Sequence, residues 1–453
     1  KEIVCGTAQH FNWIQIGAAI NHPDAGKIID ISADVNKEWG YVDSNVRIIP
    51  SSGYGDSMML RQILKQEKPD ALMMFTDPRY WIWLFQMERE IRQHIPIIYL
   101  NIWDDLPYPM YNRPFYQACD GLFAISKQTL NINKVVLGEE GCKGKVIEYL
   151  PHGVSKKFVN LSELDENLVK FEKQLFGSEK PDFTLLYNAR NIGRKRVTDI
   201  ILAWRFFLDL AEGGVEGFDS SKVKLLLHTD AVDNAGTDLI ACINSLIPEN
   251  LRTTIGIVNA RLSTEDMNLL YNSSDGVILA SSNEGWGLSL TEALLTGRMI
   301  IAPVTGGMQD QMRFENEDGS WIDFTKSFPS NHTGLVKKHG DWAIPVPIAS
   351  RACCGSPVTP YIYDDRCTIE DLGYAIFKLF NMRPEERKKL GKHGENWARG
   401  EEAGFTSEIM CNRFAKYADK VFEVFKPRER YELIKVTEAP STYVDYDPIT
   451  YSR

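Results

Sequence analysis

Short apolar runs alternate with helix-like patterns along most of this 453-residue chain, and this alternation restricts the fold more than any other feature. Apolar runs of a few residues between turn residues are typical of buried strands. Helices between such strands are typical of a parallel sheet. The pattern runs through one half of the chain and then starts again, and the length suits two units of ordinary size. The sequence therefore predicts an α/β fold with two similar halves.

The expected elements can be placed by residue number. In the first half we expect strands at 2–5, 27–31, 46–49, 71–75, 95–100, 122–125 and 146–150, and helices at 57–66, 80–93, 113–118 and 128–136. In the second half we expect strands at 183–187, 224–227, 254–258, 276–279 and 299–302, and helices at 197–210, 237–245, 264–271 and 288–296. Amphipathic helices are expected at 369–380, 385–399 and 406–425.

Two stretches interrupt the alternation. Residues 155–181 are charged and helical in pattern, which is typical of a connection between domains. Residues 321–365 have several prolines and aromatics and no clear period. We expect a long loop there, because a loop of this length in a compact domain is usually functional or disordered.

One internal similarity supports two related halves. Residues 119–126 read CDGLFAIS, and residues 274–281 read SDGVILAS. Both are expected strands that are entered through Asp-Gly. A single match of this kind is weak, but it fits two similar domains.

Residues 275–297 carry the strongest functional signal. Glu284 lies in the loop that leaves an expected strand, and Glu292 lies in the second turn of the expected helix. Between them, Gly285 and Gly287 allow the backbone to pass close to a ligand, and the helix N-terminus offers N–H groups to an anion. Two carboxylates on either side of an amide-lined phosphate site suit a sugar nucleotide, which has hydroxyls at both ends and a diphosphate between them.

A solvated loop and a surface glutamate is the alternative interpretation. For either glutamate alone we would prefer it, since most glutamates are exposed. The combination of both carboxylates with the two glycines in a strand–loop–helix context favours a binding site.

The same stretch resembles a known motif. Residues 283–297, NEGWGLSLTEALLTG, with seven residues between Glu284 and Glu292, resemble the paired-glutamate motif of retaining GT-B glycosyltransferases of family 4. Residues 302–310, APVTGGMQD, are similar to that family's Gly-Gly loop, and residues 151–154, PHGV, resemble its Pro-Asn-Gly-Val turn.

The resemblance implies the GT-B architecture, in which two Rossmann-like domains face each other across a cleft. It divides the chain into an acceptor-binding domain at 1–160, a connection at 161–181, and a nucleotide-sugar-binding domain at 182–404 that includes the 321–365 loop. Residues 405–453 are expected to form a helix that returns to the N-terminal domain, followed by a tail.

A basic segment follows the first strand of the second half and opens a helix. In residues 188–196, NARNIGRKR, Arg190 and Lys195 match the Arg and Lys with which the family contacts the donor diphosphate. The end of a strand at the start of a helix is the expected place for phosphate in such a sheet. A solvated basic turn is the alternative. Arg194 and Arg196 are expected to be solvated.

Three residues of the first half are candidates for acceptor or sugar contacts. His10 follows the first expected strand, where the family usually has a Gly-rich loop that this chain lacks. Asp104 and Asp105 follow the strand at 95–100, where the family tends to carry a His.

By resemblance, the protein moves a hexose from a UDP- or GDP-linked sugar to a hydroxyl of a glycan or other acceptor, with retention at the anomeric carbon. Glu292 would bind the ribose and Glu284 the donor sugar, while Arg190, Lys195 and the nearby amides would hold the diphosphate. The donor contacts would come from Gly285, Trp286, Gly287, Leu288, Ser289 and Glu292. A nucleotide-sugar epimerase and a non-catalytic sugar-nucleotide-binding protein are the alternatives.

Composition excludes some other classes. The net charge of −10 disfavours nucleic acid or an anionic membrane as the main partner. No apolar run approaches the roughly 18 residues of a membrane span. The eight cysteines form no Cys-x-x-Cys pair and no zinc spacing, which predicts reduced thiols in a cytoplasmic protein. The Asp-x-Asp at 445–447 lies outside any strand end, so we expect no metal and no other cofactor.

Overall fold

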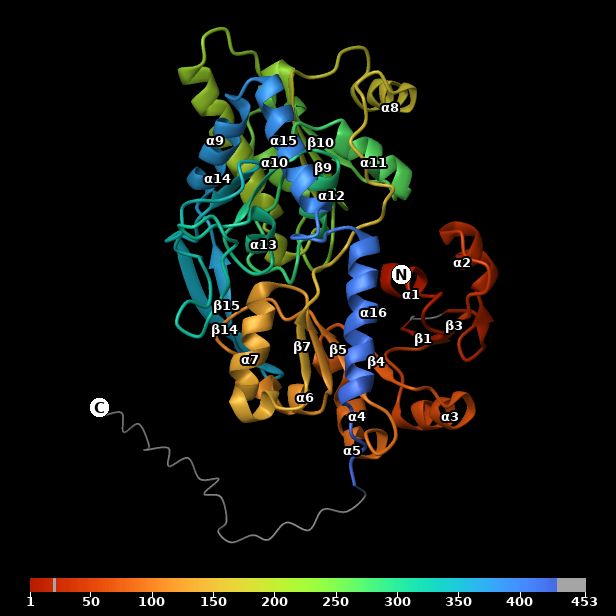
Figure 1. The fold of residues 1–453 in the computed structure, drawn as a ribbon. Helices are drawn as coiled ribbons and strands as arrows, with labels where there is room; N and C mark the ends of the chain where they lie inside the picture. The colour runs from red at the N-terminus through yellow and green to blue at the C-terminus, as the bar shows by residue number, and fades with distance from the viewer. Residues whose placement is uncertain (19–21, 430–453) are drawn as a thin grey trace, which may run out of the picture.

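The computed structural model describes residues 1–18 and 22–429, so the expected tail beyond residue 429 lies outside the described residues (Figure 1). In the second half, six parallel strands form one sheet in the order β10–β9–β8–β11–β12–β13. They are β8 (Phe183–Asn188), β9 (Val223–His228), β10 (Ile255–Val258), β11 (Gly276–Ile278), β12 (Met299–Pro303) and β13 (Ala343–Val346). Because β8 and β11 are neighbours, the order reverses beside the predicted site, as it does at ligand sites of open α/β sheets.

Helices cover both faces of this sheet (Figure 1). Their bounds are α8 (Glu166–Phe176), α9 (Val197–Gly214), α10 (Leu239–Leu246), α11 (Thr264–Asn272), α12 (Leu288–Leu295), α13 (Met308–Met312), α14 (Ile369–Phe380) and α15 (Pro384–Arg399). The core between sheet and helices is one large cluster, with Trp204, Phe207 and Tyr187 among its fully buried side chains.

The first half contains two smaller sheets. A three-stranded sheet has the order β1–β3–β2, with β2 antiparallel, and a parallel sheet has the order β4–β5–β6–β7. The strands are β1 (Trp13–Ala18), β2 (Ile29–Asp30), β3 (Val46–Ser51), β4 (Leu72–Phe75), β5 (Ile97–Asn101), β6 (Gly121–Ala124) and β7 (Val146–Tyr149). The helices are α1 (Glu2–Gly6), α2 (Ser32–Trp39), α3 (Ser57–Glu67), α4 (Ile82–Phe85), α5 (Glu88–Ile91), α6 (Arg113–Gln117) and α7 (Lys127–Cys142).

The prediction of a strand at 2–5 is wrong, because these residues form helix α1 and the first strand is β1. A short apolar run has no period that separates a strand from a buried helix. Its placement depends on a distant partner: Cys411 lies against α1, where its Sγ is 3.4 Å from the carbonyl oxygen of Glu2.

Two other stretches differ from expectation. The single helix predicted at 80–93 is broken into a 3₁₀ turn η1 (Pro78–Trp81), α4 and α5. The stretch 321–365 is more than a loop, since it supplies the edge strand β13 and an antiparallel hairpin of β14 (Ser350–Ser356) and β15 (Thr359–Arg366). In Figure 1 this hairpin extends from the second half to a position beside the first.

The last described helix, α16 (Ser407–Val424), runs from the second half along the sheet of the first (Figure 1). Its apolar face, which includes Met410, Phe414 and Val421, forms one core cluster with residues of β5, β6 and β7. The amphipathic pattern of the sequence thus becomes a link between the two halves.

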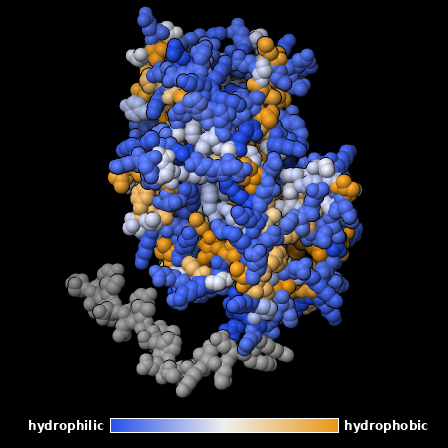
Figure 2. Space-filling model, in the orientation of Figure 1, coloured by the Kyte–Doolittle hydropathy of each residue, from blue (hydrophilic) through white to orange (hydrophobic). Residues whose placement is uncertain are grey.

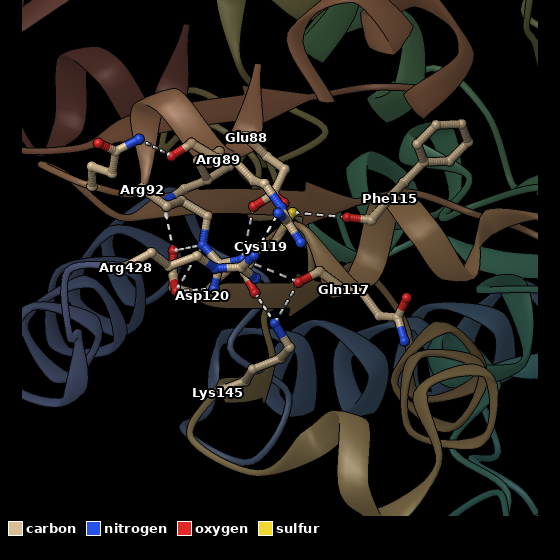
Figure 3. Close-up of polar contacts among 11 residues, drawn as sticks. Glu88, Arg89, Arg92, Phe115, Gln117, Cys119, Asp120, Lys145 and Arg428 are labelled. Atoms are coloured by element: carbon tan, nitrogen blue, oxygen red, sulfur yellow. Dashed lines mark hydrogen bonds and ion pairs between the residues drawn. The ribbon is translucent and has the colours of Figure 1, made fainter. Parts of the chain in front are cut away.

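The Asp-Gly pairs of the internal similarity make the same contacts in each half. Asp120 accepts a hydrogen bond from the amide of Ile97 at 3.0 Å and pairs with Arg92 at 2.6 Å. The close-up in Figure 3 shows this pair, with Lys145 and Arg428 beside it. In the second half Asp275 accepts from the amide of Thr184 at 2.8 Å and pairs with Arg387 at 2.9 Å.

The face drawn in Figure 2 is mostly hydrophilic, with separate hydrophobic patches. Among residues 1–18 and 22–429, no helix combines the length and the apolar character that crossing a membrane requires.

Candidate functional site

The carboxylate of Glu284 lies buried in the loop after β11, surrounded by groups that stabilise its charge. The hydroxyl of Ser281 donates to it at 2.8 Å. Lys195 forms an ion pair with the same carboxylate, and Arg194 approaches its other oxygen at 3.4 Å. Lys195 belongs to η3 (Gly193–Lys195), a 3₁₀ turn between β8 and α9. The structure therefore brings together Glu284 and Lys195, which the sequence placed in one site from distant segments.

The electrostatics of this pair are those of a buried site. Burial alone would raise the pKa of Glu284, but Lys195 and Arg194 outweigh it and hold the pKa below its ordinary value. Burial lowers the pKa of Lys195, and Glu284 opposes that shift. The buried Glu284 and Lys195 thus lie where water screens charges weakly, and the more exposed Arg194 lies beside them, which is a suitable environment for a second anion.

Arg194 and Arg196, which were expected to be solvated, both contact the motif; the Arg194 side chain is still 43% exposed, whereas that of Arg196 is mostly covered. Arg194 donates to the carbonyl of Asn283 at 2.6 Å, and Arg196 donates to the hydroxyl of Ser282 at 3.1 Å. The amide of Ser282 also donates to the carbonyl of Arg194 at 2.8 Å. The turn that carries Lys195 is therefore fixed directly on the loop that carries Glu284.

Arg190 lies at a different place in the same segment. Its guanidinium pairs with Asp233 at 2.7 Å, and its side chain is 66% exposed. No ion pair between Arg190 and Glu284 is present among the described residues. Its predicted contact with a diphosphate stays a prediction, while Arg194 is the arginine that contacts Glu284.

Glu292 faces the carboxyl-terminal edge of the sheet from α12. The hydroxyl of Tyr271 donates to its carboxylate at 2.5 Å. Burial raises the pKa of Glu292 to about 7, although the hydrogen bond from Tyr271 lowers it. This carboxyl group therefore changes its charge near neutral pH, unlike Glu284.

The loop between the two glutamates packs against the first half of the chain. A Cβ atom on Gly285 would lie 2.6 Å from the carbonyl oxygen of Ile102, so this position requires glycine for the contact between the halves. Gly287 has a φ of +87°, which glycine adopts without strain. The amide of Gly307, in the expected Gly-Gly loop, donates to the carbonyl of Glu284 at 2.9 Å. Gly285 thus serves the packing of two backbones, and its predicted contact with a ligand stays a prediction.

The start of helix α12 leaves donors available. Gly287 is its N-cap and provides no side-chain hydrogen bond. Within the described residues, the amides of Leu288 and Ser289 have no acceptor, whereas the amide of Leu290 donates to Gly287 at 3.0 Å. Free amides at the start of a helix favour an anion.

Trp286 lies in the core, where its indole N–H donates to the hydroxyl of Thr291 at 2.8 Å and its ring packs edge-on against Phe405. Only its backbone is therefore left for the predicted donor contact.

The first half contributes Asp104 and Asp105 to the same region. Burial raises the pKa of Asp104, Arg194 lowers it and the charge of Glu284 raises it, so this carboxyl group lies near the pair described above. Asp105 is fully buried and accepts a hydrogen bond from Asn283 at 2.6 Å. Burial and the charge of Asp365 raise the pKa of Asp105. Asp104 remains a candidate for ligand contact, whereas Asp105 joins the two halves.

His10 lies in a different surrounding from the one we expected. It follows helix α1 rather than a strand, and its imidazole is 3.2 Å from Asp419 of α16. No hydrogen bond between His10 and the Glu284 loop occurs in the part of the chain that the structure describes. That part also contains no group of three His, Cys, Asp or Glu side chains placed to hold a metal ion.

No protein-family model matches this sequence, and no curated protein matches it. Solved structures do match the fold. A glycosyltransferase from Rickettsia africae has 14% identity, a TM-score of 0.61 and coverage of 93% of each chain. Sucrose-phosphate synthase from Thermosynechococcus elongatus has 15% identity, a TM-score of 0.59 and coverage of 92% of each chain.

HepE from Anabaena, in complex with UDP and glucose, has 12% identity and a TM-score of 0.57, with coverage of 86% of this chain and 89% of that one. The chain has the GT-B fold. This confirms the α/β architecture that was expected from the sequence.

Two residues of the site were missed by the sequence reasoning. Arg194 stood in the basic run beside Lys195, but the run itself does not indicate which of its members contacts the Glu284 loop. Tyr271 lies in the last turn of α11 and has no signal in the local pattern. Both depend on which segments the fold brings together.

Proposed function

We propose that this protein is a glycosyltransferase that uses a nucleoside diphosphate sugar, and that it works with retention and without a metal ion. One observation carries the proposal: the buried Glu284 with Lys195 and Arg194 beside it lies close in sequence to the free amides that begin α12. Cations and amides suit a diphosphate, and a carboxylate between them suits the hydroxyls of the donor sugar. The paired-glutamate resemblance assigns the chain to family 4 within this proposal.

The proposed reaction is driven by stabilisation of the leaving group. Negative charge grows on the diphosphate as the bond to the anomeric carbon breaks. Lys195, Arg194 and the amides of Leu288 and Ser289 stabilise that charge, as fixed donors do in other sites of this kind. The acceptor hydroxyl attacks from the face that the diphosphate leaves, and its proton passes to a diphosphate oxygen. Lys195 ends the cycle paired again with Glu284.

UDP is the proposed nucleoside diphosphate. HepE has been solved with UDP and with UDP-glucose, and a trehalose-phosphate synthase from Burkholderia vietnamiensis, with 11% identity and a TM-score of 0.58, is UDP-forming. In this arrangement Glu292 binds the ribose hydroxyls, and Asp104, in the first half of the chain, faces the acceptor. Cytoplasmic location belongs to the same proposal.

Kinetics and binding of two matched variants test the assignment. Glu284→Gln should lower kcat with UDP-glucose more than it lowers the affinity for UDP, because Glu284 contacts the reacting sugar. Glu292→Gln should mainly lower the affinity for UDP. The inverse pattern would mean that the nucleotide binds in the opposite orientation. Donor turnover without any acceptor would favour the epimerase, and UDP-sugar binding without turnover would favour a non-catalytic binding protein.

The two arginines provide a second test of the same site. Arg194→Ala should lower the affinity for UDP, but not for uridine, by about 1.5–3 kcal/mol, because a charge-assisted hydrogen bond is lost. Arg190→Ala should also act on UDP rather than uridine, but with a smaller effect, since Arg190 is exposed and paired with Asp233. Calorimetry with both ligands measures each loss. Equal losses for UDP and uridine would remove the arginine concerned from the phosphates.

A further inference from the structure

A chain of hydrogen bonds leads from Glu292 across the carboxyl-terminal edge of the sheet. The hydroxyl oxygen of Tyr271 is 2.5 Å from the Glu292 carboxylate and 2.7 Å from Nδ2 of Asn188. Oδ1 of Asn188 is 2.7 Å from Nδ1 of His228. Nε2 of His228 is 3.0 Å from the carbonyl oxygen of Ala260. Two side chains, Tyr271 and Asn188, thus connect an imidazole at the end of β9 with a carboxyl group on α12.

The acceptor at one end fixes the protons along the chain. A carbonyl oxygen only accepts, so Nε2 of His228 carries a hydrogen. With the amide of Asn188 oriented as in the structure, Nδ1 must also donate, and His228 is an imidazolium. Asn188 then donates to Tyr271, Tyr271 donates to Glu292, and the Glu292 carboxylate is ionised.

A second arrangement keeps every contact. If His228 is neutral, its Nδ1 accepts, and the amide of Asn188 turns so that Nδ2 donates to it. Oδ1 then accepts from the Tyr271 hydroxyl, whose oxygen must accept from a protonated Glu292. Both arrangements hold the same number of protons. Neutral His228 with ionised Glu292 leaves one contact without a hydrogen, so the two groups titrate together.

No charged side chain among the described residues shifts the pKa of Glu292 and so alters its coupling to His228. Burial and the Tyr271 hydrogen bond account for the shift in the pKa of Glu292. On α15, Arg399 donates to the carbonyl of Leu295 at 2.8 Å, at the C-terminal end of α12. The acidic residues of α11, Glu265 and Asp266, lie in its first turn, whereas Tyr271 lies in its last.

Resting on the proposed binding of ribose by Glu292, we propose that Tyr271 and Asn188 are positioning residues that couple the protonation of Glu292 to that of His228, so that a bound nucleotide charges His228. A ribose diol donates two hydrogen bonds and needs an ionised carboxylate. Binding therefore breaks the O–H bond of Glu292, forms an N–H bond at Nδ1 of His228 and leaves the net charge unchanged. The site takes up ribose without losing a proton to water.

Proton release on binding measures this coupling. We would titrate UDP at pH 7 by calorimetry in two buffers of different ionisation enthalpy. Glu292, with a pKa of about 7, is then about half protonated. His228→Gln should release about half a proton more per UDP than the unmodified protein, because the chain no longer delivers the proton to an imidazole. Tyr271→Phe should release at least as much, because the lost hydrogen bond also raises the pKa of Glu292 further. The titration of the phosphate itself cancels in this difference.

Tyr187→Phe is the matched control. Tyr187 precedes Asn188 in β8, and its buried hydroxyl has no hydrogen-bond partner among the described residues. This variant should release the same number of protons as the unmodified protein. Equal release by all four proteins would overturn the coupling, and so would weaker binding by Tyr271→Phe with unchanged release, which would reduce Tyr271 to a packing role.

A second experiment uses the free protein and needs no nucleotide. The imidazole signal of His228 can be identified in NMR spectra by its loss in His228→Gln. If the coupling holds, the midpoint of its pH dependence should move to lower pH in Glu292→Gln and in Tyr271→Phe, and should stay in place in Tyr187→Phe. An unchanged midpoint in Glu292→Gln would overturn the coupling. If UDP does not bind, the proposed function is wrong, and the NMR titration of the free protein still tests the coupling between Glu292 and His228.

Discussion

The two halves of the chain enter a central strand in the same way. Asp120 and Asp275 precede the glycines that begin β6 and β11, and each bonds to the amide of a neighbouring strand and to a buried arginine. The pairs differ in depth: the side chains of Arg92 and Asp120 are 8% and 9% exposed, and those of Arg387 and Asp275 are 6% and 24% exposed. Figure 3 shows the first of these two pairs.

The halves differ where the same strands end. After β6, helix α7 begins almost at once, and two of its first three amides are occupied: Asp310 of the second half accepts from the amide of Lys127 at 2.8 Å, and Ser126 accepts from that of Thr129 at 3.0 Å. After β11 a longer loop carries Glu284, and the first amides of α12 stay free.

One helix start is therefore filled by a carboxylate of the protein, and the other is open to a ligand. The repeated strand entrance is therefore a structural feature that both halves share. Function depends instead on which backbone amides stay unpaired at the helix start after the strand. Four changes test this view, beginning with the largest expected effect.

Asp310 should make the contact between the halves sensitive to pH. Burial raises its pKa to about 7, so the folded protein binds this proton more tightly than the unfolded chain does. Stability should then fall as the pH rises from about 4 to 7, and the fall should be about 4 kcal/mol larger in the unmodified protein than in Asp310→Asn, in which the contribution of Glu292 remains. Urea unfolding of both proteins across that range measures the difference. Asp323→Asn, which removes an exposed partner of the Lys127 side chain, is the control and should follow the unmodified protein.

Lys195→Met should lower kcat by about 10²–10³-fold, since a fixed cation beside the leaving group is lost. Lys127→Met is the matched control at the corresponding strand end, and it should change kcat only slightly. Steady-state rates with UDP-glucose measure both. A comparable loss in the two variants would show that the open and the filled helix starts do not differ in function.

Asp120→Asn should lower the free energy of unfolding by about 3 kcal/mol, because the buried Arg92 loses its shorter ion pair and keeps only Glu88 at 3.1 Å. Asp275→Asn should cost less, since Asp275 is the more exposed of the two aspartates. Urea unfolding gives both values. A larger cost for Asp275→Asn would contradict the ranking by burial.

Leu288→Asp should fill the open helix start with a carboxylate, as Asp310 fills the other. Leu288 is 42% exposed, so the new side chain reaches solvent, and stability should rise by about 0.5 kcal/mol. Affinity for UDP should fall by roughly tenfold through charge repulsion at the phosphates, while affinity for uridine should hold. Leu288→Asn, which is nearly the same shape without the charge, separates the two effects. Unchanged UDP affinity in Leu288→Asp would place the diphosphate elsewhere.

Local pattern was enough for many of the elements. The strands at β8 and β9 and the helices α9, α12 and α14 follow from runs and periods that a few neighbouring residues define. It failed at α1, where a short apolar run is compatible with either structure. It also failed at β13 to β15, where β13 gains its partner only by joining a distant strand at the edge of the sheet.

The sequence by itself determined that Glu284 lies in a loop and Glu292 on a helix, eight positions apart, because strand ends, glycines and helix periods are local properties. Tertiary structure alone decided that Arg194 contacts Glu284 while Arg190 pairs with Asp233, that Trp286 packs into the core, and that Tyr271 bonds to Glu292. The physical reason is that each of these choices depends on the close packing of segments far apart in the chain. A shift of one residue in a short turn changes the direction in which a side chain points, and the local periodicity of the sequence does not predict that direction.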